Sequence, residues 1–179
     1  MPGYYTYLIS SLPMLHFGTR PLLNLRDFLN RCLELISEQD VKLIKKVIST
    51  DAYDLDITSP GILLKWKQFD LALRNELVKA RSIRKRIDAV KFLRKDIDFD
   101  INITQIVQAS LRQTSILEAE KFLDLERWKV LDELSSGHYF DLDFLLVYAL
   151  KLAMLERWDK INSADKPELL KKVLAEQVN

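Results

Sequence analysis

The sequence predicts an all-α protein built as a multi-helix bundle of antiparallel helical hairpins, and composition supplies the first evidence. Hydrophobic residues make up 48% of the 179 residues and charged residues 30%, which is too apolar for a disordered chain. The 4 glycines and 5 prolines are too few for the turns of an all-β protein. Leu, Lys, Glu, Arg and Ala dominate, and these residues favour helix. We expect one domain over residues 1–179, with possible sub-lobes 1–58 and 59–179.

An internal near-repeat gives the second observation. Residues 119–128 (AEKFLDLERW) and 149–158 (ALKLAMLERW) are identical at six of ten positions, with a constant offset of thirty. The intervening residues 135–138 (SSGH) suit a turn between helices. We therefore predict an antiparallel helical hairpin, with Trp128 and Trp158 mostly buried in structural roles.

Hydrophobic spacing and capping signals indicate the helices of the N-terminal third. Residues 4–9 could form a short strand or the first turns of a buried helix, and we favour helix. Residues 24–36 have apolar positions at three- and four-residue spacing, and Asn24 suits the N-cap. Residues 37–40 (SEQD) form a variant capping box that opens a second helix, with Asp40 where Glu or Gln is usual. Residues 51–58 should form a loop.

A long central helix follows. Ser59 and Pro60 form a start signal, because proline at the first helical position gives up no intrahelical hydrogen bond. The apolar pattern beyond Trp66, which we assign a structural role, runs to about Leu93 without glycine or proline. We expect the alternating residues 96–101 (DIDFDI) to form a connection.

Further helices are expected from about Thr104 and over residues 114–134. Gly137 stands where a C-terminal glycine is common, and Asp141 suits the N-cap of a helix over residues 142–158. That helix carries Tyr148, a further structural candidate. It is apolar almost all round between residues 144 and 154, so it is either enclosed by neighbours or exposes a patch for a partner. A last helix is expected at about residues 167–177, with Asp165 as a possible cap.

Charge is unevenly distributed although the net charge is +1. Residues 79–95 hold eight bases against one acid, whereas residues 118–143 hold eight acids against three bases. The basic segment supplies our candidate partner-binding residues, which are Arg81, Arg84, Lys85, Arg86, Lys91, Arg94 and Lys95. Because Ile83, Ile87, Val90 and Leu93 interleave at helical spacing, we expect these bases on the solvated flanks of an amphipathic helix. Such a face could dock a charged protein.

The sequence offers no candidate catalytic, cofactor-binding or metal-binding residues. Acids cluster at residues 51–56 and 96–100, but the glycine and terminal glutamate of an EF-hand loop are missing. His16 and His138 have no metal-ligand partner at the usual spacing. Cys32 lies on the apolar face of its helix and is expected to be a small core residue. We therefore expect no cofactor, no small-molecule substrate and no enzymatic activity.

Four stretches carry a family resemblance, and they are residues 4–15 (YYTYLISSLPML), 66–77 (WKQFDLALRNEL), 120–134 (EKFLDLERWKVLDEL) and 140–152 (FDLDFLLVYALKL). Together they resemble a poorly characterised bacterial family encoded with V-type (A/V-type) ATP synthases. The last is also similar to a helix near the end of the C subunit of V-type ATPases, called the d subunit in eukaryotes. That protein is a funnel of helices on the membrane rotor ring, where it receives the central shaft. The resemblance implies that this chain forms part of such a funnel.

The resemblance further implies a non-catalytic role like that of the C subunit, which links the rotor ring to the central shaft. Its partners would be other V-type ATPase subunits, and it would be cytoplasmic, held at the inner membrane through the complex. The single cysteine and the lack of a secretory signal are compatible with that location. An alternative is a nucleic-acid-binding or regulatory helical module that uses the bases of residues 79–95. A helix-turn-helix pattern or zinc ligand set does not accompany those bases, so we prefer the first hypothesis.

Overall fold

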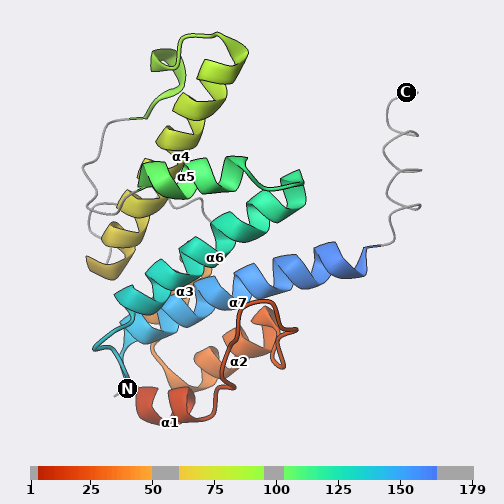
Figure 1. Cartoon of the computed structure of the whole chain (residues 1–179). Coiled ribbons are helices and arrows are strands. Elements are labelled where there is room, and N and C mark those ends of the chain that lie inside the picture. The colour runs from red at the N-terminus through yellow and green to blue at the C-terminus, as the bar shows by residue number, and fades with distance from the viewer. Residues whose placement is uncertain (1–3, 50–60, 95–102, 165–179) are drawn as a thin grey trace, which may run out of the picture.

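The computed structural model describes residues 4–49, 61–94 and 103–164, and within these residues every regular element is a helix. The predicted all-α class is confirmed (Figure 1). The elements are α1 (Tyr5–Ser10), α2 (Leu25–Leu35), α3 (Glu38–Ser49), α4 (Gly61–Lys85), the short 3-10 helix η2 (Val90–Phe92), α5 (Ile103–Leu111), α6 (Ile116–Leu134) and α7 (Leu142–Ser163). The loop at residues 51–58, the start signal at residues 59–60, the connection at residues 96–101 and the last helix at residues 167–177 lie outside the described residues.

The predicted caps of α2, α3 and α7 are present. The Asn24 side chain accepts a hydrogen bond from the backbone N–H of Asp27, and Asp141 accepts one from Phe144. At the start of α3 the Ser37 hydroxyl accepts from the Asp40 N–H at 3.2 Å and donates to the Asp40 carboxylate at 2.6 Å. That carboxylate also accepts a hydrogen bond from the Tyr5 hydroxyl at 2.6 Å. The variant capping box therefore joins α3 to α1, and the preference for helix at residues 4–9 is confirmed.

α6 and α7 form the predicted antiparallel hairpin. Lys151 pairs with Asp132 near the turn, and Trp158 hydrogen-bonds Asp124 near the open end. Gly137 in the turn has a φ of 89°, a conformation that glycine adopts without strain. α6 begins two residues later than expected, capped by Ser115, and α7 continues to Ser163, beyond the predicted end at residue 158.

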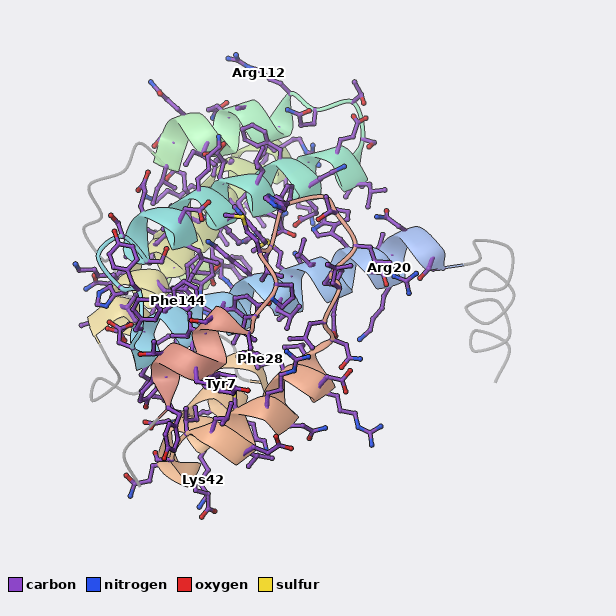
Figure 2. All side chains as sticks on the ribbon, turned by 90° about the horizontal axis from the view of Figure 1, so that it is seen from below. Tyr7, Arg20, Phe28, Lys42, Arg112 and Phe144 are labelled. Atoms are coloured by element: carbon purple, nitrogen blue, oxygen red, sulfur yellow. The ribbon has the colours of Figure 1, made fainter. Side chains whose placement is uncertain are left out.

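α7 is the central helix, and neighbours enclose most of it. It packs against α2, α3 and α6, whereas α4, α5 and α6 pack on one another. Seen from below, Phe28 lies between α2 and α7 (Figure 2), and its ring is 5.3 Å from that of Tyr148. Buried side chains from α1 through α7 join in one hydrophobic cluster. Between the two interpretations of the apolar α7, the structure therefore supports enclosure.

The prediction that the central helix runs to about Leu93 is wrong. α4 ends at Lys85, and Arg86 adopts a left-handed conformation with a φ of 55°. The N–H of Arg86 donates to the carbonyl of Ile83 at 3.2 Å, and that of Ile87 donates to Ser82 at 3.1 Å. These are the two hydrogen bonds of a Schellman motif, in which glycine usually holds the position of Arg86. The missing glycine explains why the sequence did not reveal the end of the helix.

None of the described helices combines the length and the apolar character needed to cross a membrane.

Candidate partner-binding hook

Beyond the end of α4 the chain reverses and returns along the helix, and we call residues 82–94 the hook. The hook projects at one end of the molecule, at the top of Figure 1. The Asp88 carboxylate accepts a hydrogen bond from the N–H of Val90 at 3.0 Å and so opens η2. At the end of the return, Asn75 clamps the backbone of Arg94. Its amide donates to the Arg94 carbonyl and its carbonyl accepts from the Arg94 N–H, both at 3.1 Å.

Asn75 is the residue that fixes the hook, and it was not among the residues singled out from the sequence. Asn75 itself is buried, and its two bonds to the Arg94 backbone are partly buried. Its position inside a helical pattern gave no signal, because the partner is the backbone of a residue nineteen positions later. A polar residue at a buried helical position is the one sign that could have identified it.

The hook carries the predicted basic residues in different settings. Arg84 and Lys85 occupy the last turn of α4, Arg86 the reversal and Lys91 the 3-10 helix, and all four are exposed. Arg94 is exposed at the end of the return. Just before the hook, Arg81 lies 3.9 Å from Glu120 on α6, and both side chains remain about half exposed. Lys95 lies outside the described residues.

The expected apolar face between these bases does not exist. Ile83 is 79% exposed, Ile87 48% and Val90 73%, although we expected all three on the buried side of one helix, and Phe92 beside them is 57% exposed. α4 ends before Ile87, Val90 and Leu93, so the helical spacing of this set has no structural meaning. The hook therefore presents bases and large apolar side chains together, a combination typical of interaction surfaces.

An ionic network centred on two buried carboxylates, Asp70 and Asp124, joins α4 to α6 and α7. It was not predicted from the sequence. The Asp70 carboxylate on α4 forms ion pairs with the guanidinium groups of Arg74, at 2.7 Å, and of Arg127 on α6, at 3.3 Å. Arg127 also contacts Asp124 at 2.9 Å. Asp124 is fully buried, and it further pairs with Arg157 and accepts a hydrogen bond from the Trp158 indole at 2.7 Å. The network ties α4, α6 and α7 together, and its two carboxylates are buried although Arg74 and Arg157 remain partly exposed, so we assign it a structural role.

The network explains why the repeated Leu-Glu-Arg-Trp segment is not a repeated site. In α7, Arg157 and Trp158 reach back to Asp124, and Glu156 accepts the N–H of Leu25 at 2.5 Å, at the start of α2. In α6, Arg127 joins Asp124 to Asp70 instead, and Trp128 lies 5.6 Å from the ring of Phe17 and 5.1 Å from Lys151 Nζ. The two helices of an antiparallel hairpin run in opposite directions, so residues related by a constant offset do not have equivalent positions and meet different neighbours.

The four aromatic residues assigned structural roles are all buried, and the prediction for Trp128 and Trp158 is confirmed. The ring of Trp66 lies 5.8 Å from that of Phe69 inside the bundle. The Tyr148 hydroxyl donates to the carbonyl of Pro13 at 2.9 Å, and burial raises the pKa of this phenol to about 12. Tyr148 thereby connects α7 to the segment after α1.

Next to Tyr148 an open pocket of about 360 Å³ lies between the segment after α1, the end of α6 and the start of α7. Its wall is mostly apolar, with Met14 at the rim and Phe144 on α7, and the Lys151–Asp132 pair supplies its charged groups. Lys151 is nearly buried and paired with Asp132, whose side chain is about half exposed.

Other candidate groups have structural explanations. His138 lies 2.6 Å from the carboxylate of Asp141 and 3.6 Å from that of Asp143, and the hydrogen bond to Asp141 raises the pKa of this imidazole. Cys32 is fully buried, and burial raises the pKa of its thiol to about 12, so it is a core residue. Within the described part of the chain, no three His, Cys, Asp or Glu residues are grouped as metal ligands would be.

Within the described residues the protein is all-helical, and its clamped, projecting hook exposes basic and apolar side chains. A family described as "Protein of unknown function (DUF2764)" matches residues 96–178, somewhat less than half of the chain. The matched part contains α5, α6 and α7, whereas the hook precedes it. No curated protein and no solved structure matches the chain.

Proposed function

We propose that this chain is a non-catalytic component of a bacterial V-type ATP synthase, similar to the C subunit, that links the membrane rotor ring to the central shaft. The proposal derives from the resemblance of four separate stretches of sequence. One structural observation supports it most: these stretches, far apart along the chain, contact one another directly. Tyr148 of the fourth bonds Pro13 of the first, Lys151 pairs with Asp132 of the third, and Arg127 of the third pairs with Asp70 of the second.

In this role the chain acts through protein contacts alone, without cofactor or substrate. Its all-helical bundle agrees with part of a helical funnel, and the apolar pocket beside Tyr148 provides a seat for a side chain of the ring or shaft. The basic hook, as a second contact surface, would face an acidic surface next to the rotor. The chain would thus be held at the inner membrane as a peripheral component of the complex.

The test is co-purification from the native source with a tag on this chain. After mild detergent extraction, we expect the ring and shaft proteins of the V-type ATP synthase to be recovered with it. Met14→Glu, at the exposed rim of the pocket, should reduce that recovery several-fold, because it places a charge where an apolar side chain would bind. Leu22→Glu is the matched control, since Leu22 is equally exposed and lies outside this pocket. A chain absent from the intact complex would refute the proposal.

The second candidate function is nucleic-acid binding through the hook, and the exposure of its bases is the observation in its favour. Phosphate neutralisation would give binding that falls steeply with salt concentration. A mobility shift with generic DNA or RNA at low salt tests this candidate, and the absence of a shift removes it. The exposed aliphatic residues of the hook have no role in phosphate contacts, so we rank this function second.

A further inference from the structure

We propose that the hook binds the surface of an anionic lipid bilayer, with its apolar side chains entering the interface and its bases contacting the headgroups. This inference rests on the proposed function in one respect, namely that the hook is an attachment surface near the membrane. It adds the chemical nature of the acidic surface that the hook meets.

The hook exposes several large apolar side chains. Ile83, Ile87, Val90 and Phe92 lie within ten residues and are each about half exposed or more. Large apolar groups that gather on a protein surface usually mark a site of contact with a protein or a membrane. Phe92 in particular is an aromatic residue of the kind that anchors interfacial segments.

Hydrogen bonds hold the hook in a defined conformation. The Schellman bonds at Arg86, the turn made by Asp88 and the Asn75 clamp each fix one part of the reversal. A segment that exposed these side chains only by fraying would not need a buried asparagine to fasten its end. The apolar side chains are therefore presented by a defined structure.

The charge of the hook and its projecting shape both suit an anionic bilayer. Arg84, Lys85, Arg86, Lys91 and Arg94 are exposed and alternate along the hook with the apolar residues, and the one acid of the hook, Asp88, accepts a backbone hydrogen bond. A bilayer with anionic lipids offers negative headgroups above an apolar layer and adapts to a projecting shape. An acidic protein patch would need a matching cavity for the apolar residues, and a polynucleotide would leave the aliphatic ones in water. The bilayer is the partner that satisfies both kinds of side chain.

The test is co-sedimentation of the purified full chain with vesicles. We expect binding to vesicles of phosphatidylglycerol and phosphatidylcholine, little binding to phosphatidylcholine alone, and weakening as salt is raised. Val90→Ser with Phe92→Ser should reduce the partition coefficient by about tenfold. Leu22→Ser with Ile116→Ser is the matched control, because both residues are exposed but lie outside the hook, and it should leave binding unchanged.

The basic residues need a separate pair of variants. Lys85→Gln with Lys91→Gln should lower binding by about 25-fold, since each base near an anionic surface contributes roughly fivefold. Lys42→Gln with Lys45→Gln removes two exposed lysines of α3 and should have little effect. All four substituted lysines are exposed, so circular dichroism should show unchanged folding.

Three results would overturn the inference. They are no binding to anionic vesicles at low salt, equal losses in hook and control variants, or binding to nucleic acid or an acidic protein with none to vesicles. The outcome is separate from that of the ATP synthase proposal, because co-purification is measured in detergent and vesicle binding is measured with the isolated chain. Vesicle binding without recovery of ATP synthase proteins would retain this inference and remove the proposed function.

Discussion

Asp124 shows at the residue scale how this fold tolerates charge in its interior. A buried carboxylate is destabilising unless its lone pairs are satisfied by cations and donors. Asp124 has Arg127, Arg157 and the Trp158 indole as partners. Arg127 also forms an ion pair with Asp70. The network therefore specifies how α4, α6 and α7 are placed, because another arrangement would leave an ion unpaired.

Asp124→Asn should lower the free energy of unfolding by about 3 kcal/mol, since it removes the fully buried carboxylate that faces Arg157, the Trp158 indole and the mostly buried Arg127. Glu126→Gln is a matched control on the same helix. Its partner Lys129 is also three residues away but is mostly exposed, so we expect a loss of less than about 1 kcal/mol. Urea unfolding of both variants measures the difference. Equal losses would show that the network does not contribute beyond a surface ion pair.

His138 and Asp141 form a pair that should give a pH signature. The hydrogen bond to Asp141 raises the pKa of His138 above 6.5. Burial acts to raise the pKa of Asp141, but the bonds from Phe144 and His138 outweigh it and hold the pKa below 3.8. The stabilisation that protonated His138 gains from this pair is thus fully present below pH 6.5. It is lost as the pH rises through the pKa that His138 has in the folded protein. The aspartate contribution is present above pH 3.8 and is lost as pH falls through its lower folded pKa.

Asp141→Asn tests this pair while it preserves the N-cap of α7, because asparagine caps as well as aspartate does. We expect the pKa of His138, followed by NMR titration, to fall toward the ordinary value of about 6.5. The difference in stability between the wild type and His138→Asn should be largest between about pH 4 and 6.5 and should shrink above that window. An unchanged pKa in Asp141→Asn would refute the assigned cause.

At the element scale, the starts of α2, α3 and α7 could be predicted from the sequence, whereas the end of α4 could not. Asn24, Ser37 and Asp141 act on backbone groups within three residues, so local sequence determines them. The end of α4 depends instead on Arg86 adopting a left-handed conformation that non-glycine residues rarely take. The Asn75 clamp, nineteen residues away from Arg94, helps to compensate for that strain.

Asn75→Ala should release the return segment of the hook. It removes the two hydrogen bonds that Asn75 makes to the Arg94 backbone, so we expect a loss of about 1–3 kcal/mol, at roughly 0.5–1.5 kcal/mol for each bond. Limited trypsin digestion should then cut faster after Arg86 and Lys91. Glu76→Ala removes a surface contact with Lys79 on the same helix and should leave cleavage unchanged. A hook that is cut at the wild-type rate in Asn75→Ala would mean that the clamp is not what holds it.

For the whole molecule, the core argues that the possible sub-lobes unfold together. α7 packs against α2 and α3 of the first lobe and against α6 of the second, and the buried side chains form one cluster. We expect thermal unfolding followed by far-UV circular dichroism and by tryptophan fluorescence to give the same midpoint. All three tryptophans lie in α4, α6 and α7, and Trp128 also contacts Phe17 of the first lobe, so different midpoints from the two probes would contradict this prediction.

The basic residues of the candidate site could be predicted from the sequence, but their arrangement could not. A run of lysine and arginine is visible whatever the fold, and the exposed positions of Arg84, Lys85 and Lys91 agree with it. The apolar residues among them were assigned to a buried face, because periodicity was extended through a helix that had already ended. That error concealed the mixed apolar and basic character of the hook.

Local sequence was enough to predict the helical class, the caps and the α6–α7 hairpin, because these depend on composition and on contacts between residues a few positions apart. Which charges are buried, where α4 reverses and what the hook exposes became known only from the packed structure. Arg127 joins Asp70 to Asp124 and Arg157 pairs with Asp124, which connects three helices, and Asn75 contacts Arg94 only after the chain has turned back. Such pairings depend on how helices are placed in space, which the local pattern of a sequence does not encode.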